Sequence, residues 1–148
     1  MPCTSVVRRV PHPWEELYSL VLEVGSYPRF VPFCHALDVL EQSNHDGADE
    51  VTARMEVGFA AFRERFTSRI LGRRASQEIL ISNVDGPFHY FDGRWLFTPA
   101  GDGATDIRLE VDYQFCNPFM SAVVSTAFWP IAEVLVAAFE TRAAQVLA

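Results

Sequence analysis

Four histidines and three cysteines are the residues of this chain with the widest chemical range. The histidines stand at positions 12, 35, 45 and 89, and the cysteines at positions 3, 34 and 116. The odd cysteine count, without a CxxC pair, predicts no disulfide framework and favours a reducing compartment. His35 follows Cys34 directly, but neighbours on a strand point to opposite faces, so we expect no metal site there. The sequence also has no GxSxG, HExxH, P-loop or GxGxxG motif, so it contains none of these common catalytic signatures.

Two polar residues remain as candidates for contact with a bound molecule. Glu64 is the one charged residue expected on the inner, apolar face of its hairpin, and His89 follows the turn Asp85-Gly86-Pro87-Phe88. Each has two interpretations. It is either a solvated residue at the rim of the sheet or a polar contact at the mouth of a pocket.

Three arginines, Arg63, Arg65 and Arg69, alternate along one predicted strand and would share its outer face. Such a stripe could meet phosphates, but the expected cross-strand neighbour of Arg65 is Glu56. The chain as a whole has 19 acidic residues against 12 basic ones, all of them Arg, and a formal net charge of −7. Since non-specific nucleic-acid binding depends on basic residues that neutralise phosphates, we expect a solvated outer face and no DNA partner.

Aromatic residues provide the positive signal: the chain contains 12 Phe, 4 Tyr and 3 Trp, and 49% of it is hydrophobic. Many fall on the predicted inner face, where they would form either a packed core or the wall of a concave, mostly apolar pocket for a small molecule. We predict a cavity lined by the following residues, with Glu64 and His89 as polar contacts: Phe33, Met55, Phe59, Phe62, Phe66, Trp95, Phe97, Tyr113, Phe115, Phe119, Val123, Phe128, Ile131 and Leu135.

The elements that must position these residues follow from periodicity. A short strand at 4–10 precedes a helix at about 13–24 and a second short helical segment at about 26–31. The period then changes to two, and Gly-rich breaks separate six strands. These strands are predicted at 36–42, 49–59, 62–71, 77–84, 90–98 and 105–115, with breaks at 44–47, 72–74, 85–87 and 101–103.

The C-terminal third reads as one long helix. Asn117 is a suitable N-cap and Pro118 a suitable first helical residue, and the pattern continues to about residue 146. Pro130 should kink or break this helix. Residues 113–132 carry no formal charge, but their polar residues and prolines favour a buried helix over a membrane span, with a membrane-touching helix between the two. The N-terminus lacks the apolar segment of a signal peptide.

One hairpin can be checked from polarity alone. If Ala60-Ala61 is its turn, then Met55 faces Phe66 on an apolar side and Glu56 faces Arg65 on a polar side. The turn is weak in this form, because two-residue turns favour Gly or Asn. A longer turn that includes Gly58 is the alternative.

Together these elements predict a single α+β domain over residues 1–148. A sheet with one wet side must bury its other side against helices. We therefore expect a helix-grip fold, in which a curved antiparallel sheet of about seven strands wraps around the long C-terminal helix, with two short helices after the first strand.

Six stretches of the sequence resemble the coenzyme Q-binding protein family, a branch of the START/polyketide cyclase-like superfamily. They are Tyr27-Pro28-Arg29-Phe30-Val31-Pro32-Phe33-Cys34, Val57-Gly58-Phe59, Phe66-Thr67-Ser68-Arg69, Val84-Asp85-Gly86-Pro87-Phe88, Gly93-Arg94-Trp95-Leu96-Phe97-Thr98-Pro99 and Ala138-Phe139-Glu140-Thr141-Arg142-Ala143. The resemblance implies a hydrophobic tunnel that holds ubiquinone or a related isoprenoid lipid. It also implies a lipid chaperone that supports respiratory electron transport and is not an enzyme, with no catalytic cofactor. Such a protein would belong to the bacterial cytoplasm, with peripheral contact at the inner membrane left open.

Two rival functions stay open. Bacterial relatives in this family include RatA-like inhibitors of ribosomal subunit association, for which the arginine stripe is the only support in the sequence. A polyketide cyclase-like enzyme is the other rival, with Glu64 or His89 as its acid or base. The chain departs from the family at Ala60-Ala61, where a Gly-containing pair often with Lys is expected, and in having no Lys at all. Both departures weaken electrostatic docking to anionic membranes or RNA, and no feature indicates an oligomeric state.

Overall fold

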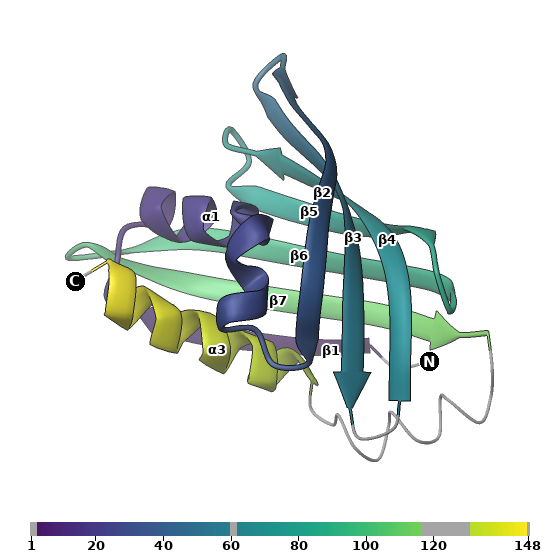
Figure 1. The fold of residues 1–148 in the computed structure, drawn as a ribbon. Coiled ribbons are helices and arrows are strands. Elements are labelled where there is room, and N and C mark those ends of the chain that lie inside the picture. Colours follow the sequence, from purple (N-terminus) through teal and green to yellow (C-terminus); the bar gives the residue numbers. More distant parts are fainter. Residues whose placement is uncertain (1–2, 60–61, 117–130, 148) are drawn as a thin grey trace.

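The computed structural model describes residues 3–59, 62–116 and 131–147 of the chain (Figure 1). The secondary-structure elements in this part of the chain occur in an order close to the predicted one. They are β1 (Cys3–Val10), α1 (Trp14–Leu22), the 3-10 helix η1 (Val24–Arg29), β2 (Cys34–His45), β3 (Ala48–Phe59), β4 (Phe62–Arg73), β5 (Glu78–Asp85), β6 (Phe88–Gly101), β7 (Ala104–Phe115) and α3 (Ile131–Val146).

The seven strands form one antiparallel sheet in the order β1-β7-β6-β5-β4-β3-β2. The helix-grip architecture expected from the sequence is therefore present. Figure 1 shows β2, β3 and β4 running steeply across the direction of β5, β6 and β7. A register shift at Thr67/Ser68 marks an irregularity between β4 and β5, and such bulges bend a strand. The sheet thus curves around its inner face.

The hairpin of β3 and β4 has the register that polarity predicted. Met55 lies opposite Phe66, and Glu56 lies opposite Arg65. The predicted turn residues Ala60-Ala61 lie outside the described residues. Register is strongly specified here because a shift of one residue would turn the whole apolar set toward solvent.

Two of the predicted breaks between strands are tight turns, and a third is misplaced. Asp46 and Gly47 both have positive φ, as do Asp102 and Gly103. This is the backbone of a type I′ turn, which joins twisted antiparallel strands. The predicted break at 72–74 is wrong, since β4 continues through Gly72 to Arg73. Glycine suits this strand position because the phenol end of Tyr18 occupies the space where a side chain would stand.

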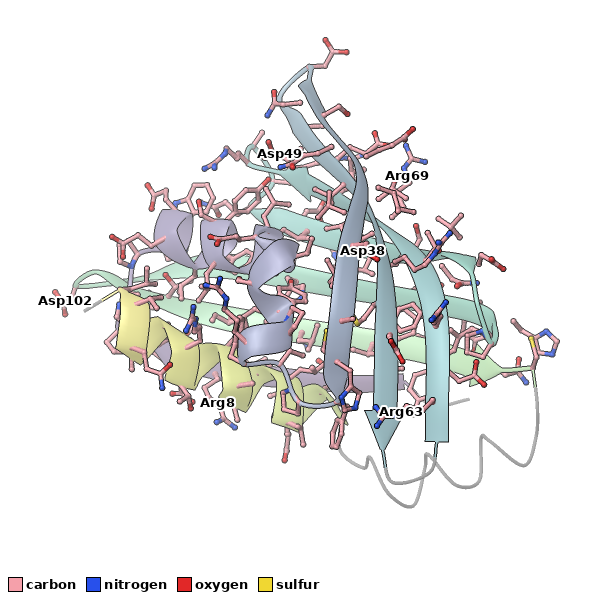
Figure 2. The ribbon with its side chains drawn as sticks, in the orientation of Figure 1. Arg8, Asp38, Asp49, Arg63, Arg69 and Asp102 are labelled. Atoms are coloured by element: carbon pink, nitrogen blue, oxygen red, sulfur yellow. The ribbon has the colours of Figure 1, made fainter. Side chains whose placement is uncertain are left out.

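The three helices pack on the inner side of the sheet (Figure 1). Leu17 and Tyr18 of α1 are buried, as are Val136 and Phe139 of α3. The Tyr18 hydroxyl donates a hydrogen bond of 2.8 Å to Asp49, a residue near the far end of the sheet (Figure 2). The Tyr18 ring is fully buried.

The described C-terminal helix begins at Ile131, so the predicted segment 118–130 and the predicted kink at Pro130 lie outside the described residues. Ala132, Val136, Phe139 and Ala143 form its buried face, and Leu135 is half-buried. Val146, the last residue of the helix, is 46% exposed.

Candidate functional site

A cavity of about 190 Å³ lies on the inner face of the sheet, between β3–β6, the segment from η1 to β2, and α3. Most of its wall is apolar. It is lined by Tyr27, Val31, Pro32, Phe33, Cys34, Met55, Val57, Gly58, Glu64, Phe66, Ser68, Ile70, Ile81, Pro87, Phe88, Phe91, Trp95, Val134, Leu135 and Phe139.

The structure brings several of the predicted lining residues together. Phe33, Met55, Phe66, Trp95 and Leu135 all border this cavity. They come from a loop, three strands and a helix that are far apart in the sequence, and the curvature of the sheet makes them neighbours. Glu64 also borders the cavity, as one of the two interpretations of its position required.

Two other predicted residues lie beside the cavity and not in its wall. Phe97 is 1% exposed and stacks on Trp95, with ring centroids 6.4 Å apart, while its other neighbour is Tyr18 of α1. It is therefore a core residue. Tyr113 packs behind the wall, 6.2 Å from both Phe88 and Phe91.

The remaining predicted lining residues are only partly described or not described. Phe59, Phe62 and Phe115 occupy strand ends and Ile131 begins α3, so their backbone positions place them near the same end of the sheet. Phe119, Val123 and Phe128 lie outside the described residues.

His89 is exposed and does not border the cavity, although its neighbours Pro87 and Phe88 do. Its Nδ1 lies 3.8 Å from the Sγ of Cys116, which is exposed as well. A register shift between Phe88 and Tyr90 interrupts the regular alternation of β6 at His89, and its side chain is exposed there.

The polar groups in the cavity wall are few. Glu64 and Ser68 point inward from β4, and Cys34 begins β2. Burial raises the pKa of the Cys34 thiol to about 11, which keeps the sulfur protonated at neutral pH. Its Sγ lies 3.8 Å from the carbonyl oxygen of Ala36.

Sequence reasoning missed an aromatic cluster on the helix side of the cavity. The Phe139 ring of α3 meets Tyr27 at 5.3 Å, Phe30 at 5.1 Å and Trp95 at 5.0 Å, all in edge-to-face geometry. The buried Tyr27 hydroxyl donates to the carbonyl oxygen of Val21, and burial raises the pKa of this phenol. Edge-to-face pairs stabilise such clusters beyond their buried area.

A second missed cluster forms the opposite wall. Phe88 lies 5.5 Å from Phe66 and 5.1 Å from Phe91, measured between ring centroids. A signal for Phe91 was available, because it stands four residues before Trp95 on the same strand and so shares its face. Phe88 and Tyr27 were visible only as parts of the quoted family stretches.

The outer face carries a second, larger hollow of about 540 Å³ over β4–β7. Its charged lining residues are Arg69, Asp92, Arg94, Glu110 and Asp112. Arg94 contacts Glu78 at 3.2 Å and Glu110 at 3.7 Å, and Arg69 contacts Glu50 at 2.7 Å. Because solvated charged side chains line the outer hollow, whereas the wall of the inner cavity is mostly apolar, we regard the smaller inner cavity as the candidate site.

The predicted arginine stripe is present on β4 but is not a uniform cationic surface. Arg63 and Arg69 extend from this strand (Figure 2). Arg69 is paired with Glu50, and Arg65 faces Glu56 across the hairpin. Acidic neighbours therefore offset much of the positive charge on this face.

Two features of the described residues bear on what the site can hold. Residues 3–59, 62–116 and 131–147 contain no group of three or more His, Cys, Asp or Glu side chains arranged to hold a metal ion. Within the same ranges, the helices fall short of the length and apolar character that crossing a membrane requires.

Comparisons with known proteins place the chain in a family. Residues 10–140 match the family model described as polyketide cyclase / dehydrase and lipid transport. The chain is 35% identical to the ribosome association toxin RatA of Escherichia coli K12 over 146 residues, which covers 99% of this chain and 89% of RatA. It is 26% identical to the mitochondrial coenzyme Q-binding protein COQ10 of Dictyostelium discoideum, covering 95% of this chain and 71% of that protein.

Solved structures show the same fold. A START superfamily protein from Mycobacterium smegmatis superimposes with a TM-score of 0.81 at 22% identity, covering 97% of this chain and 98% of that one. The Zhui aromatase/cyclase from a Streptomyces species superimposes with a TM-score of 0.79 at 17% identity, covering 99% and 96% of the two chains. At these identities the likeness concerns the fold and leaves the chemistry open.

Proposed function

Because the chain belongs to the polyketide cyclase / dehydrase and lipid transport family, we propose that it binds an isoprenoid quinone or a related lipid in its inner cavity. The observation that carries this proposal is the cavity itself. Its wall is built from aromatic and aliphatic side chains, with only a few polar groups, and this is the usual composition of a small-molecule site. The name of the COQ10 relative adds quinone to the candidate ligands.

The size of the cavity suggests how such a ligand would sit. Its 190 Å³ is below the 300–1,000 Å³ or so that is usual for a pocket enclosing a whole drug-sized molecule. A substituted ring with the first part of its tail is a better match than a complete isoprenoid chain. We expect the rest of the tail to leave through the mouth and to meet other apolar surface, at the protein or at a membrane.

We further propose that the protein carries its ligand and does not transform it. Among the lining residues, Glu64 is the single titratable side chain besides the protonated Cys34 thiol and the buried Tyr27 phenol. Acid–base catalysis needs a positioned group with a matched partner, and nothing of the kind faces Glu64 in the described chain. A soluble carrier in the bacterial cytoplasm, with peripheral contact at the inner membrane, fits this role.

Filling the cavity tests the proposal. Leu135→Trp places a large ring in the cavity from α3, and Val146→Trp adds the same ring to an exposed position of the same helix. The purified proteins are titrated with decylubiquinone, and binding is followed by quenching of tryptophan fluorescence. Wild type and Val146→Trp should bind, and Leu135→Trp should bind at least tenfold more weakly. Equal binding by all three folded proteins would place the ligand elsewhere.

The 35% identity with RatA along almost the whole chain favours a second candidate function, inhibition of ribosomal subunit association. Adding the protein to ribosomal subunits and separating them on a sucrose gradient tests it directly. A rise in free subunits supports this function. An unchanged profile at protein concentrations above that of the subunits excludes it. Leu135→Trp in the same assay shows whether an open cavity is needed for the effect.

A further inference from the structure

The polar groups of the cavity wall differ in whether they can donate or accept a hydrogen bond. Glu64, Ser68 and Cys34 provide its polar side chains, apart from the Tyr27 hydroxyl, which is already bonded to Val21. No arginine or histidine stands among the described lining residues. The described cavity wall therefore offers a ligand no hydrogen-bond donor from a cationic side chain.

Each of these three side chains can form only certain hydrogen bonds. An ionised carboxylate only accepts hydrogen bonds, whereas a serine hydroxyl both donates and accepts. The Cys34 thiol is a weak donor and lies against the carbonyl oxygen of Ala36 at 3.8 Å. Ser68 can thus serve a ligand oxygen of either kind, and Glu64 is the group that discriminates.

Glu64 is held in the wall without a partner of its own. It lies opposite Val57 on the inner face of the β3–β4 hairpin and is half-buried. Its strand neighbours Arg63 and Arg65 belong to the outer face, where Arg63 packs over Gly58 and Arg65 faces Glu56. In the described part of the chain, no hydrogen bond or ion pair engages the Glu64 carboxylate. Its oxygens therefore need donors from water or from a ligand.

We propose that Glu64 makes the cavity select the reduced, hydroxyl-bearing form of its ring ligand, the quinol, over the quinone. This inference rests on the proposed function and specifies its ligand. A quinol hydroxyl donates to the carboxylate. A quinone oxygen only accepts, so it would face the carboxylate with no proton between them. A hydrogen bond to a charged group stabilises by about 1.5–3 kcal/mol, which corresponds to a preference of about ten- to a hundredfold.

The selectivity has a measurable thermodynamic consequence. Binding that favours the reduced form raises the midpoint potential of the bound two-electron couple, by about 30 mV for each tenfold preference. The protein itself supplies no electrons in this scheme. It would hold the quinol as cargo until another protein oxidises it.

The test compares decylubiquinone with decylubiquinol, titrated anaerobically into three proteins. Glu64→Gln keeps the shape of the side chain but adds an amide donor that a quinone oxygen can accept from. Glu56→Gln makes the same change on the outer face of the neighbouring strand and is the matched control. We expect wild type and Glu56→Gln to bind the quinol at least tenfold more tightly. We expect a ratio near one for Glu64→Gln, mainly through tighter quinone binding.

The outcomes separate the two proposals. If wild type binds both forms with equal affinity, or binds the quinone more tightly, the selectivity is overturned and the lipid-binding function stands. The same holds if Glu64→Gln, with an unchanged circular dichroism spectrum and unfolding midpoint, keeps the wild-type ratio. If neither form binds to folded wild type, both proposals fall together.

Discussion

The inner face of the sheet has two ends built from similar residues, and only one of them is filled. Under α1, the side chains of Tyr18, Ile79 and Phe97 are at most 1% exposed and pack against one another. Between the β3–β4 hairpin and α3, Met55 and Phe66 are half-buried and border the cavity. The same curved sheet contributes to both ends, and both are rich in aromatic rings.

The covering element accounts for the difference. Helix α1 inserts Tyr18 as far as Gly72, where the missing side chain makes room for its ring. The hydroxyl of Tyr18 then reaches Asp49, so even its polar end is satisfied. At the cavity, the described residues of η1 and α3 approach the strands without filling the space between them. Residue type therefore does not distinguish a packed core from a cavity. The difference comes from how closely the helices pack over the sheet.

The largest expected effect comes from truncating one ring at each end. Phe97→Ala should lower the free energy of unfolding by about 3–5 kcal/mol, because it leaves a cavity in a packed region. Phe66→Ala should cost about 1–2 kcal/mol, since that ring already borders empty space and loses fewer contacts. Chemical denaturation followed by circular dichroism measures both. Equal losses would mean that the cavity end is packed as tightly as the core.

The next contrast uses two thiols at different depths. Two variants, each with Cys3→Ser, keep one thiol: Cys116→Ser leaves Cys34, and Cys34→Ser leaves the exposed Cys116. At pH 8, Cys34 should react with a maleimide about a hundredfold more slowly than Cys116, because burial keeps Cys34 protonated. Its rate should rise until the pH passes about 11.

The same thiol makes folding depend on pH in a defined direction. Its pKa is raised in the folded protein, so folding favours the neutral thiol. That contribution is complete below about pH 9 and is lost as the pH rises toward about 11. Cys34→Ala should flatten this part of the stability profile. A similar loss in both proteins would assign the dependence to other groups, such as the Tyr18 and Tyr27 phenols, whose pKa values are also raised.

The smallest expected difference in stability is between alanine substitutions at two strand glycines. Gly72→Ala should cost about 1–3 kcal/mol, since its new methyl group meets the Tyr18 ring and hydroxyl. Gly93→Ala should change stability by less than about 1 kcal/mol, because its methyl group would find Ile81 at 3.4 Å and Phe91 at 3.7 Å, close to ordinary contact. Unfolding midpoints of the two variants give the answer. A larger loss at Gly93 would mean that the cavity end tolerates less than the core end.

Local patterns predicted most of the strands and the register of one hairpin, because the alternation of polarity has only one consistent pairing there. The same patterns misplaced Gly72, which reads as a turn signal until the ring of Tyr18 explains it. For the site, the alternation on β4 placed Glu64 and Phe66 on the inner face. It could not separate Phe97 from Phe91, since both lie on the inner face of β6 and differ only in which helix covers them.

The sequence by itself determined the family, the antiparallel sheet with one wet side, and the lack of a known catalytic motif. The family follows from the resemblance of the quoted sequence stretches, whereas the sheet follows from periodicity and turn residues, which are local along the chain. Only the tertiary structure decided which aromatic rings pack solid and which border a cavity, that His89 is exposed, and that Glu64 faces the cavity with no partner among the described residues. Those properties depend on how separate segments meet in space, because burial is set by the elements that cover a residue and not by its own position in a pattern.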